Sequence, residues 1–194
     1  MRYSTKIFYT AIVTLFLFGG VFCGVQSASA ADSKELPRKK EALNTLTPKV
    51  VGLAHQYGAA NLDKKPVLLD QLIAYATERE NILKDLMELD AKSALQFAIS
   101  EESRKTFPSS AQDHIEKKVT DLRGTYELMV ADDFVHGKAD YKHKVRTADG
   151  EWYSLHFADT EQRPITPGAE VTLDGLNVGR DIAVEKILEK GGKS

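Results

Sequence analysis

The segment YKHKVRTADGEWYSLHF, residues 141–157, predicts a β-hairpin and with it the fold of the second half of the chain. Apolar and polar residues alternate on both sides of residues 148–150, which is the pattern of two strands that bury one face. A two-residue turn would place basic residues beside apolar ones across the hairpin. A three-residue turn with Gly150 in a left-handed conformation instead pairs Val145 with Tyr153 and separates an apolar face from a polar face. We therefore expect the second register.

The polar face of this hairpin is the candidate binding site. It brings the basic residues of one strand beside the aromatic and imidazole side chains of the next: Lys142, Lys144, Arg146, Trp152 and His156. Arg146 is expected directly opposite Trp152, where a guanidinium over an indole contributes roughly 0.5 to 1 kcal/mol at an exposed site. Such a row could hold an acidic peptide, a glycan or a phosphate-bearing ligand. The alternative is an ordinary solvated sheet face whose lysines protect an edge from aggregation.

Further segments with a two-residue period predict a small barrel around the hairpin. The spacing of apolar residues changes from a helical period to a period of two at residues 123–124. Short strands are also expected at residues 170–173 and 181–185. Five short strands without an intervening helix favour an antiparallel five-stranded barrel over residues 123–188, similar to an oligonucleotide- or oligosaccharide-binding (OB) barrel. The final residues, 189–194, are expected to form a disordered tail.

Helical periodicity dominates residues 43–122, before the barrel. Its clearest segment is residues 66–89, where charged side chains, Arg79 among them, are expected largely off the apolar stripe. Asp90 is placed to cap a further helix that ends near residue 105, and a short last helix completes the region. The sequence thus predicts an α+β protein in which consecutive α-helices precede the barrel.

The N-terminal residues 1–30 have the three parts of a secretory signal peptide. A basic start with Arg2 and Lys6 is followed by an apolar run and by small residues at Ala28 and Ala30. The alternatives are a permanent membrane anchor, although polar and glycine residues dilute the run, and a lipoprotein, although a phenylalanine precedes the cysteine. Cleavage near Ala30 predicts a secreted or periplasmic protein that has no contact with the membrane after cleavage.

Removal of the signal peptide changes the chemistry of the chain. The following residues, 31–42, are charged and are expected to form a disordered leader. The whole chain has 26 basic and 28 acidic residues, so the mature protein is mildly acidic and no binding to nucleic acid is expected. The only cysteine, Cys23, lies in the signal peptide. The mature protein therefore lacks disulfides and thiol nucleophiles.

No motif of a catalytic or metal site is found. The spacing of His136, His143 and His156 matches no zinc motif, and in the expected register the last two point to opposite faces. The adjacent Asp132 and Asp133 fit a solvated turn better than a calcium or carboxylate site. Nucleophile-elbow and phosphate-loop motifs are absent from the sequence. We therefore expect no cofactor, no metal and no enzymatic activity; a small hydrolase whose site forms only in three dimensions is an alternative.

Two sets of residues resemble the N-terminal region of multidomain secreted bacterial proteins. The motifs are Asp90-x-x-x-Ala94-Leu95, Arg104-x-x-Phe107-Pro108 and Gly124-x-x-x-Leu128-x-Val130, then residues 147–157 with Pro167-Gly168-x-x-Val171. In that group the region commonly precedes a metallopeptidase-like or adhesin-like portion. The resemblance implies an accessory module, here expected alone because the chain stops at Ser194, that docks on, masks or presents an exported protein or glycan. A prodomain-like inhibitor of a secreted peptidase is the alternative.

Overall fold

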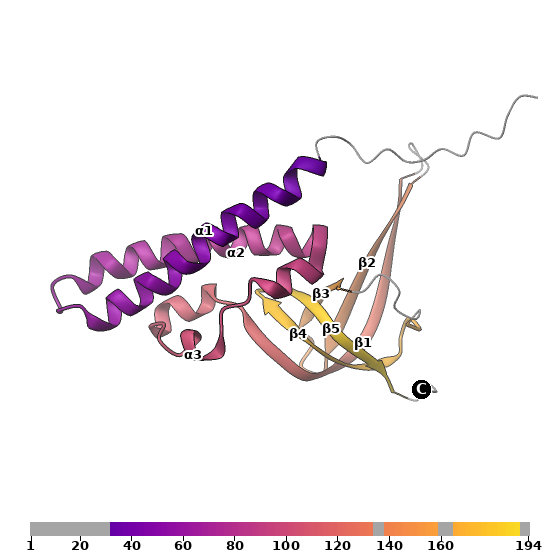
Figure 1. Cartoon of the computed structure of the whole chain (residues 1–194). Coiled ribbons are helices and arrows are strands. Elements are labelled where there is room, and N and C mark those ends of the chain that lie inside the picture. Colours follow the sequence, from indigo (N-terminus) through magenta and orange to yellow (C-terminus); the bar gives the residue numbers. More distant parts are fainter. Residues whose placement is uncertain (1–31, 134–137, 159–164, 191–194) are drawn as a thin grey trace, which may run out of the picture.

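A computed structural model describes residues 32–133, 138–158 and 165–190 of the chain (Figure 1). Two long helices, α1 (Asp32–Ala59) and α2 (Lys65–Gln96), lie side by side. The short helix α3 (Glu101–Arg104) and the 3-10 helix η1 (Ser109–His114) connect them to the sheet. The strands are β1 (Lys117–Asp133), β2 (Lys138–Thr147), β3 (Trp152–Phe157), β4 (Glu170–Val178) and β5 (Asp181–Glu189). The predicted α+β class, with helices before strands, is confirmed.

The five strands close into a barrel in the order β1-β2-β3-β5-β4. All neighbouring strands are antiparallel except β3 and β5, which run parallel with Leu155 beside Ile182. The expectation of a purely antiparallel barrel was therefore wrong. The reason is geometric: directions cannot alternate around a closed ring with an odd number of strands, so at least one neighbouring pair must be parallel.

The predicted register of the hairpin between β2 and β3 is confirmed. Val145 is paired with Tyr153, and Arg146 with Trp152. Gly150 has a φ of 87°, and the amide of Thr147 donates to the carbonyl of Glu151 over 3.0 Å to close the turn. The three-residue turn thus separates an inner apolar face from an outer polar face, as the alternation of the sequence requires.

Three apolar clusters hold the described part together. The first fills the barrel with Tyr126, Val145, Leu155, Val171, Leu173, Ile182 and Val184. The second packs α2, through residues such as Leu83 and Met87, against Ala183 and Leu176 on the outside of β5 and β4. The third lies between α1, α2 and η1. The helical pair is therefore packed on one outer side of the barrel, where it covers part of β4 and β5.

The N-terminal part of α1 differs from the expectation of a disordered leader over residues 31–42. The helix begins at Asp32, and Leu36 packs against the cluster that contains Leu43. Lys39 forms an ion pair with Asp85 of α2, with 2.7 Å between Nζ and Oδ2. The charged residues that suggested disorder thus include partners for the neighbouring helix.

Strand β1 also begins earlier than expected, at Lys117 instead of near residue 123. Its pairing with β4 shifts between Val119 and Leu122, and Asp121 has a φ of 54°. This irregularity interrupts the alternation of side chains, so the sequence lacks a two-residue period there. The expected short helix before residue 123 is limited to η1.

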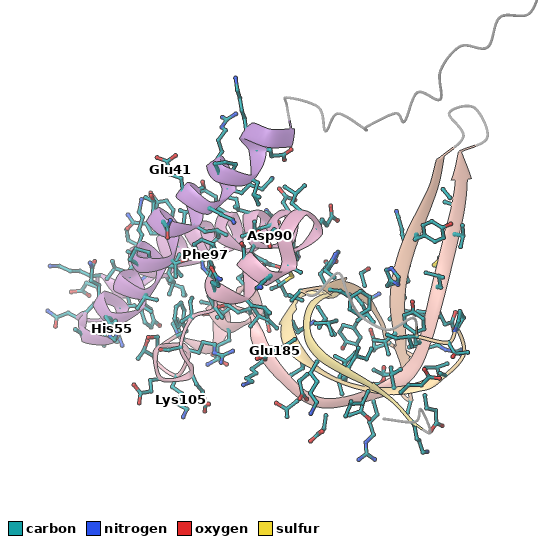
Figure 2. The ribbon with its side chains drawn as sticks, turned by 45° about the vertical axis from the view of Figure 1, so that its right-hand side comes forward. Glu41, His55, Asp90, Phe97, Lys105 and Glu185 are labelled. Atoms are coloured by element: carbon teal, nitrogen blue, oxygen red, sulfur yellow. The ribbon has the colours of Figure 1, made fainter. Side chains whose placement is uncertain are left out.

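Asp90 caps the last part of α2, as predicted. Its φ of −158° and ψ of 80° are non-helical and mark a kink inside the helix. The amide of Ser93 donates to Asp90 Oδ1 over 2.9 Å, and Lys40 Nζ lies 3.1 Å from Oδ2. Figure 2 shows Asp90 at the end of the helical pair that adjoins the barrel.

A buried ion pair joins the helices to the first strand. Arg79 and Glu116 have exposed fractions of 0% and 1%. Arg79 also donates to the hydroxyl of Thr47 over 3.0 Å and to the carbonyl of Phe97 over 2.7 Å. The amide of Ile99 donates to Glu116 Oε1 over 2.5 Å. The expectation that Arg79 lies off the apolar stripe was wrong, and its hydrogen bonds compensate for the loss of hydration.

Candidate functional site

The predicted site residues lie on adjacent strands. Lys144 is paired with Ser154, and Arg146 with Trp152. The guanidinium carbon of Arg146 lies 5.5 Å from the centroid of the Trp152 ring, which is the expected cation–π contact. We call the outer surface that carries Lys142, Lys144, Arg146, Trp152 and His156 the basic face.

One carboxylate of β1 borders the basic face. Glu127 is paired with Lys144 across the strands, and its Oε1 lies 3.7 Å from Arg146 Nη2. Both side chains of this ion pair are more than a third exposed, at 51% for Arg146 and 37% for Glu127, so solvent screens the attraction. Glu127 is thus the register partner of Lys144 and the ion-pair partner of Arg146 at the centre of the basic face.

Two hollows flank the basic face. The first has a volume of about 670 Å³, and its lining includes Lys142 and His156. The second has a volume of about 680 Å³, and its lining includes Arg146, Arg123 and Lys190. Lys144 and Trp152 line neither hollow. The five predicted residues therefore do not converge on one pocket: Lys142 and His156 line the first hollow, and Arg146 lines the second.

The first hollow, which we call the α2 cleft, forms where β2 and β3 separate. In the described part of the chain, β2 and β3 are paired only from Lys144–Ser154 to Arg146–Trp152. Beyond Ser154, strand β3 continues beside β5. The cleft opens in this gap, between residues 141–143 of β2 and 154–158 of β3, and residues 87–92 of α2 form its other wall.

The two imidazoles of the cleft have different partners. His156 Nε2 lies 2.9 Å from Asp181 Oδ1, whereas His143 Nδ1 lies 2.6 Å from the hydroxyl of Tyr126. The ring of His143 also meets the ring of Phe157 edge-on, with 5.0 Å between centroids. His143 therefore belongs to the inner side of the sheet, while the alternation of β3 places His156 on the outer side.

Burial shifts the pKa values of His143 and of its partner Tyr126. Burial lowers the pKa of His143, and the neighbouring His156 lowers it further through charge repulsion. Burial also raises the pKa of Tyr126. A neutral imidazole with a protonated phenol fits the short distance, because the Tyr126 hydroxyl can then donate to His143 Nδ1.

The cleft contains residue types that hydrolases use, without the contact that activates a nucleophile. Ser154 and His156 share the outer side of β3, and Asp181 is the register partner of Ser154. Within the described residues, no hydrogen bond joins Ser154 to His156. The hydrogen bond between nucleophile and base that acyl transfer requires is thus not formed in this part of the chain.

Several predicted features lie outside the described residues. These are the signal peptide, His136, and the side chains of Asp132 and Asp133 at the end of β1. Among the residues that are described, no three His, Cys, Asp or Glu side chains gather in a way that could hold a metal ion. None of the described helices is long and apolar enough to cross a bilayer.

Comparison with models of protein families, with curated proteins and with solved structures found no match to this chain. The resemblance to the N-terminal region of multidomain secreted bacterial proteins therefore stays a prediction.

Sequence reasoning missed the residues that complete the surroundings of the basic face. Asp181 reaches His156 only because β5 lies parallel to β3, and residues 87–92 reach the cleft only because α2 packs on the barrel. Neither contact has a local signal in the sequence. Glu127 could have been found from the pairing of β1 with β2, since both strands had been expected.

Proposed function

We propose that the protein is an exported, non-catalytic binding module that holds an acidic partner on its basic face. The observation that carries this proposal is the side-by-side placement of Lys144 and Arg146 with Trp152 on two paired strands. Cations beside a partly exposed indole offer both charge and a flat apolar surface. This combination suits carboxylate-bearing chains, either acidic peptides or acidic glycans.

The balance of charge supports an anionic ligand. Lys144 and Arg146 lie at the centre of the basic face, and Glu127 borders them. The second hollow adds Arg123, while the ammonium of Lys190 there lies 2.6 Å from a carboxylate oxygen of Glu170. Association with an acidic partner should therefore weaken as ionic strength rises, because exposed charges are screened within roughly 10 Å at 0.1 M salt.

The architecture supports a role in recognition. A five-stranded barrel of this kind resembles OB barrels, in which the surface of the second and third strands is a common ligand site. This analogy concerns the location alone, because one fold serves many functions. The export of the module is proposed from the signal peptide predicted over residues 1–30.

The experiment compares two variants that change net charge equally. Lys144→Glu/Arg146→Glu reverses the centre of the basic face, and Lys64→Glu/Lys186→Glu reverses two exposed lysines elsewhere. The mature protein is passed over immobilised polyglutamate, and in a second arm over polygalacturonate, at several salt concentrations. We expect the first variant to lose retention on at least one polymer and the control to keep it. Equal loss in both variants, or no retention of the unchanged protein on either polymer, would overturn the proposal.

A further inference from the structure

The second hollow lies over β1 at a place where this strand is paired on both sides. Thr125 is the register partner of Arg146 in β2 and of Glu170 in β4, and Arg123 is the partner of Thr172 in β4. All of these residues line the hollow, which we call the β1 hollow. Because β2 and β4 occupy both backbone edges of β1 here, a ligand in the hollow meets side chains and cannot add to β1 as a strand.

Three polar side chains of the β1 hollow have no partner in the protein. Tyr126 and Val171 are buried inside the barrel, at 3% and 2% exposed, so the alternation of the strands places Arg123, Thr125 and Thr172 on its outer side. In the part of the chain that the structure describes, none of these three side chains forms a hydrogen bond or an ion pair. A guanidinium and two hydroxyl groups are therefore available to a ligand.

The charges that line the hollow favour an anion. The charged lining residues are Arg123, Arg146, Lys190 and Glu170. Glu170 and Lys190 pair with each other, with 2.6 Å between the carboxylate oxygen and the ammonium nitrogen. Glu127 does not line the hollow, but it lies 3.7 Å from Arg146 and offsets part of that charge. The guanidinium of Arg123 stays uncompensated by contact, so a negative group is attracted to it.

Other carboxylates near the hollow do not line it. Asp149, in the turn between β2 and β3, accepts a hydrogen bond from the hydroxyl of Thr147. Glu151 pairs with Arg180, with 3.1 Å between Oε2 and Nη2. Asp121, which lies earlier in β1, is outside the lining. These three carboxylates therefore do not neutralise the arginines of the hollow by direct contact.

The β1 hollow has the size and the hydrogen-bonding groups for one acidic sugar. Its volume of about 680 Å³ is in the range of small-molecule sites, roughly 300–1,000 Å³. A carboxylate accepts two parallel hydrogen bonds from a guanidinium, and sugar hydroxyls both donate to and accept from threonine hydroxyls. A glutamate side chain would use the guanidinium but leave Thr125 and Thr172 without partners. The hollow therefore suits a uronic acid better than an acidic peptide.

We infer that the β1 hollow binds one uronic acid residue of an acidic glycan. Its carboxylate lies between Arg123 and Arg146, and its ring hydroxyls bond to Thr125 and Thr172. This inference rests on the proposed function and names the partner as a glycan. Arg146 belongs to both the hollow and the basic face, with its guanidinium carbon 5.5 Å from the centroid of the Trp152 ring. A neighbouring sugar of the same chain can therefore pack its apolar ring face on the indole.

The test titrates the mature protein with trigalacturonate, a chain of three uronic acids, to millimolar concentration and follows backbone amides by NMR. We expect saturable shifts at the amides of Gly124, Thr125 and Val171. Triglutamate with blocked termini has the same charge but lacks sugar hydroxyls. We expect it to bind at least about tenfold more weakly, since two hydrogen bonds are missing. Methyl-esterified trigalacturonate, which keeps the hydroxyls and loses the charge, should also bind at least about tenfold more weakly.

Variants separate the contribution of charge from that of the hydroxyl groups. Arg123→Gln should weaken trigalacturonate binding about tenfold through the loss of a charge-assisted hydrogen bond. Arg38→Gln removes another exposed arginine, in α1, and should leave the affinity unchanged. Thr125→Val/Thr172→Val keeps the branched shape that strands favour. It should weaken trigalacturonate binding about tenfold and leave triglutamate binding unchanged.

The outcomes separate the inference from the proposed function. Equal affinity for trigalacturonate and triglutamate, shifts that leave out the amides of the hollow, or unchanged affinity in Arg123→Gln would overturn the inference. The proposed function stands in that case if Lys144→Glu/Arg146→Glu still loses retention on a polymer that Lys64→Glu/Lys186→Glu keeps. If the unchanged protein is retained on neither polymer and trigalacturonate shifts no amide of the hollow, both are wrong.

Discussion

Arg79 of α2 and Glu116, the residue before β1, form a buried ion pair with 2.5 Å between Nη1 and Oε2. Both side chains have an exposed fraction of 0%. The pair connects the helical part of the protein to the strand from which the barrel starts. The position of α2, and hence the wall of the α2 cleft, depends on this connection.

We predict that Arg79→Met destabilises the protein by about 3–5 kcal/mol, because Glu116 would be left as a buried charge without its partner. The double variant Arg79→Met/Glu116→Leu should cost less than Arg79→Met alone. Urea unfolding measures both free energies. As a control, Lys105→Ala removes an ion pair with Glu101 in which both side chains are over 70% exposed, and it should cost far less than Arg79→Met. A double variant less stable than Arg79→Met would contradict this account.

Gly124 and Gly52 should respond oppositely to alanine. A Cβ atom at Gly124 would lie 2.6 Å from the carbonyl oxygen of Arg146, whereas at Gly52, inside α1, it would meet nothing within 4 Å. We expect Gly124→Ala to destabilise the protein by about 1–3 kcal/mol through overpacking. Gly52→Ala should stabilise it by about 0.5–1 kcal/mol through helix propensity. Thermal unfolding measures both, and a neutral Gly124→Ala would show that β1 and β2 approach less closely.

The sequence allowed the β2–β3 hairpin to be predicted in register because its information is local. The turn at Gly150 and the alternation around it select one pairing. The parallel contact of β3 with β5 depends on closure of the whole barrel, so no local pattern reveals it. Arg79 lies in helical register with the buried Ala76 and Leu83, yet its charge suggested solvent. Its partner Glu116 is 37 residues away, and only the fold brings them together.

Asp90 should contribute to stability in a pH-dependent way. Partial burial raises its pKa, but hydrogen bonds from Ser93 and the ammonium of Lys40 outweigh burial and lower the pKa below its ordinary value of 3.8. The stabilisation is therefore complete above that value and is lost as pH falls through and below it. Asp90→Asn keeps a capping side chain but does not titrate. We expect the unfolding free energy of this variant to fall less steeply than that of the unchanged protein in this acidic range; equal slopes would contradict the assignment.

His143 should destabilise the fold on mild acidification. Because burial and His156 lower the pKa of His143 below its ordinary value of 6.5, the unfolded chain binds the proton more readily than the folded one. The contribution of neutral His143 to the free energy of unfolding is then fully present above about pH 6.5 and is lost at lower pH. His143→Gln keeps an acceptor for Tyr126 without this titration, so its melting temperature should fall less between about pH 7.5 and 5.5. A normal pKa for His143 in an NMR titration would contradict this prediction.

The fluorescence of Trp152 tests the central claim, that an acidic partner binds the basic face, most directly. Trp152 is the only tryptophan of the chain, and Arg146 lies over its ring. Titration with soluble polyglutamate should change its emission in a saturable way, and the change should disappear at high salt and in Lys144→Glu/Arg146→Glu but persist in Lys64→Glu/Lys186→Glu. Polyglutamate binding, measured by calorimetry, without any change in Trp152 emission would contradict the claim and place the contact on another surface.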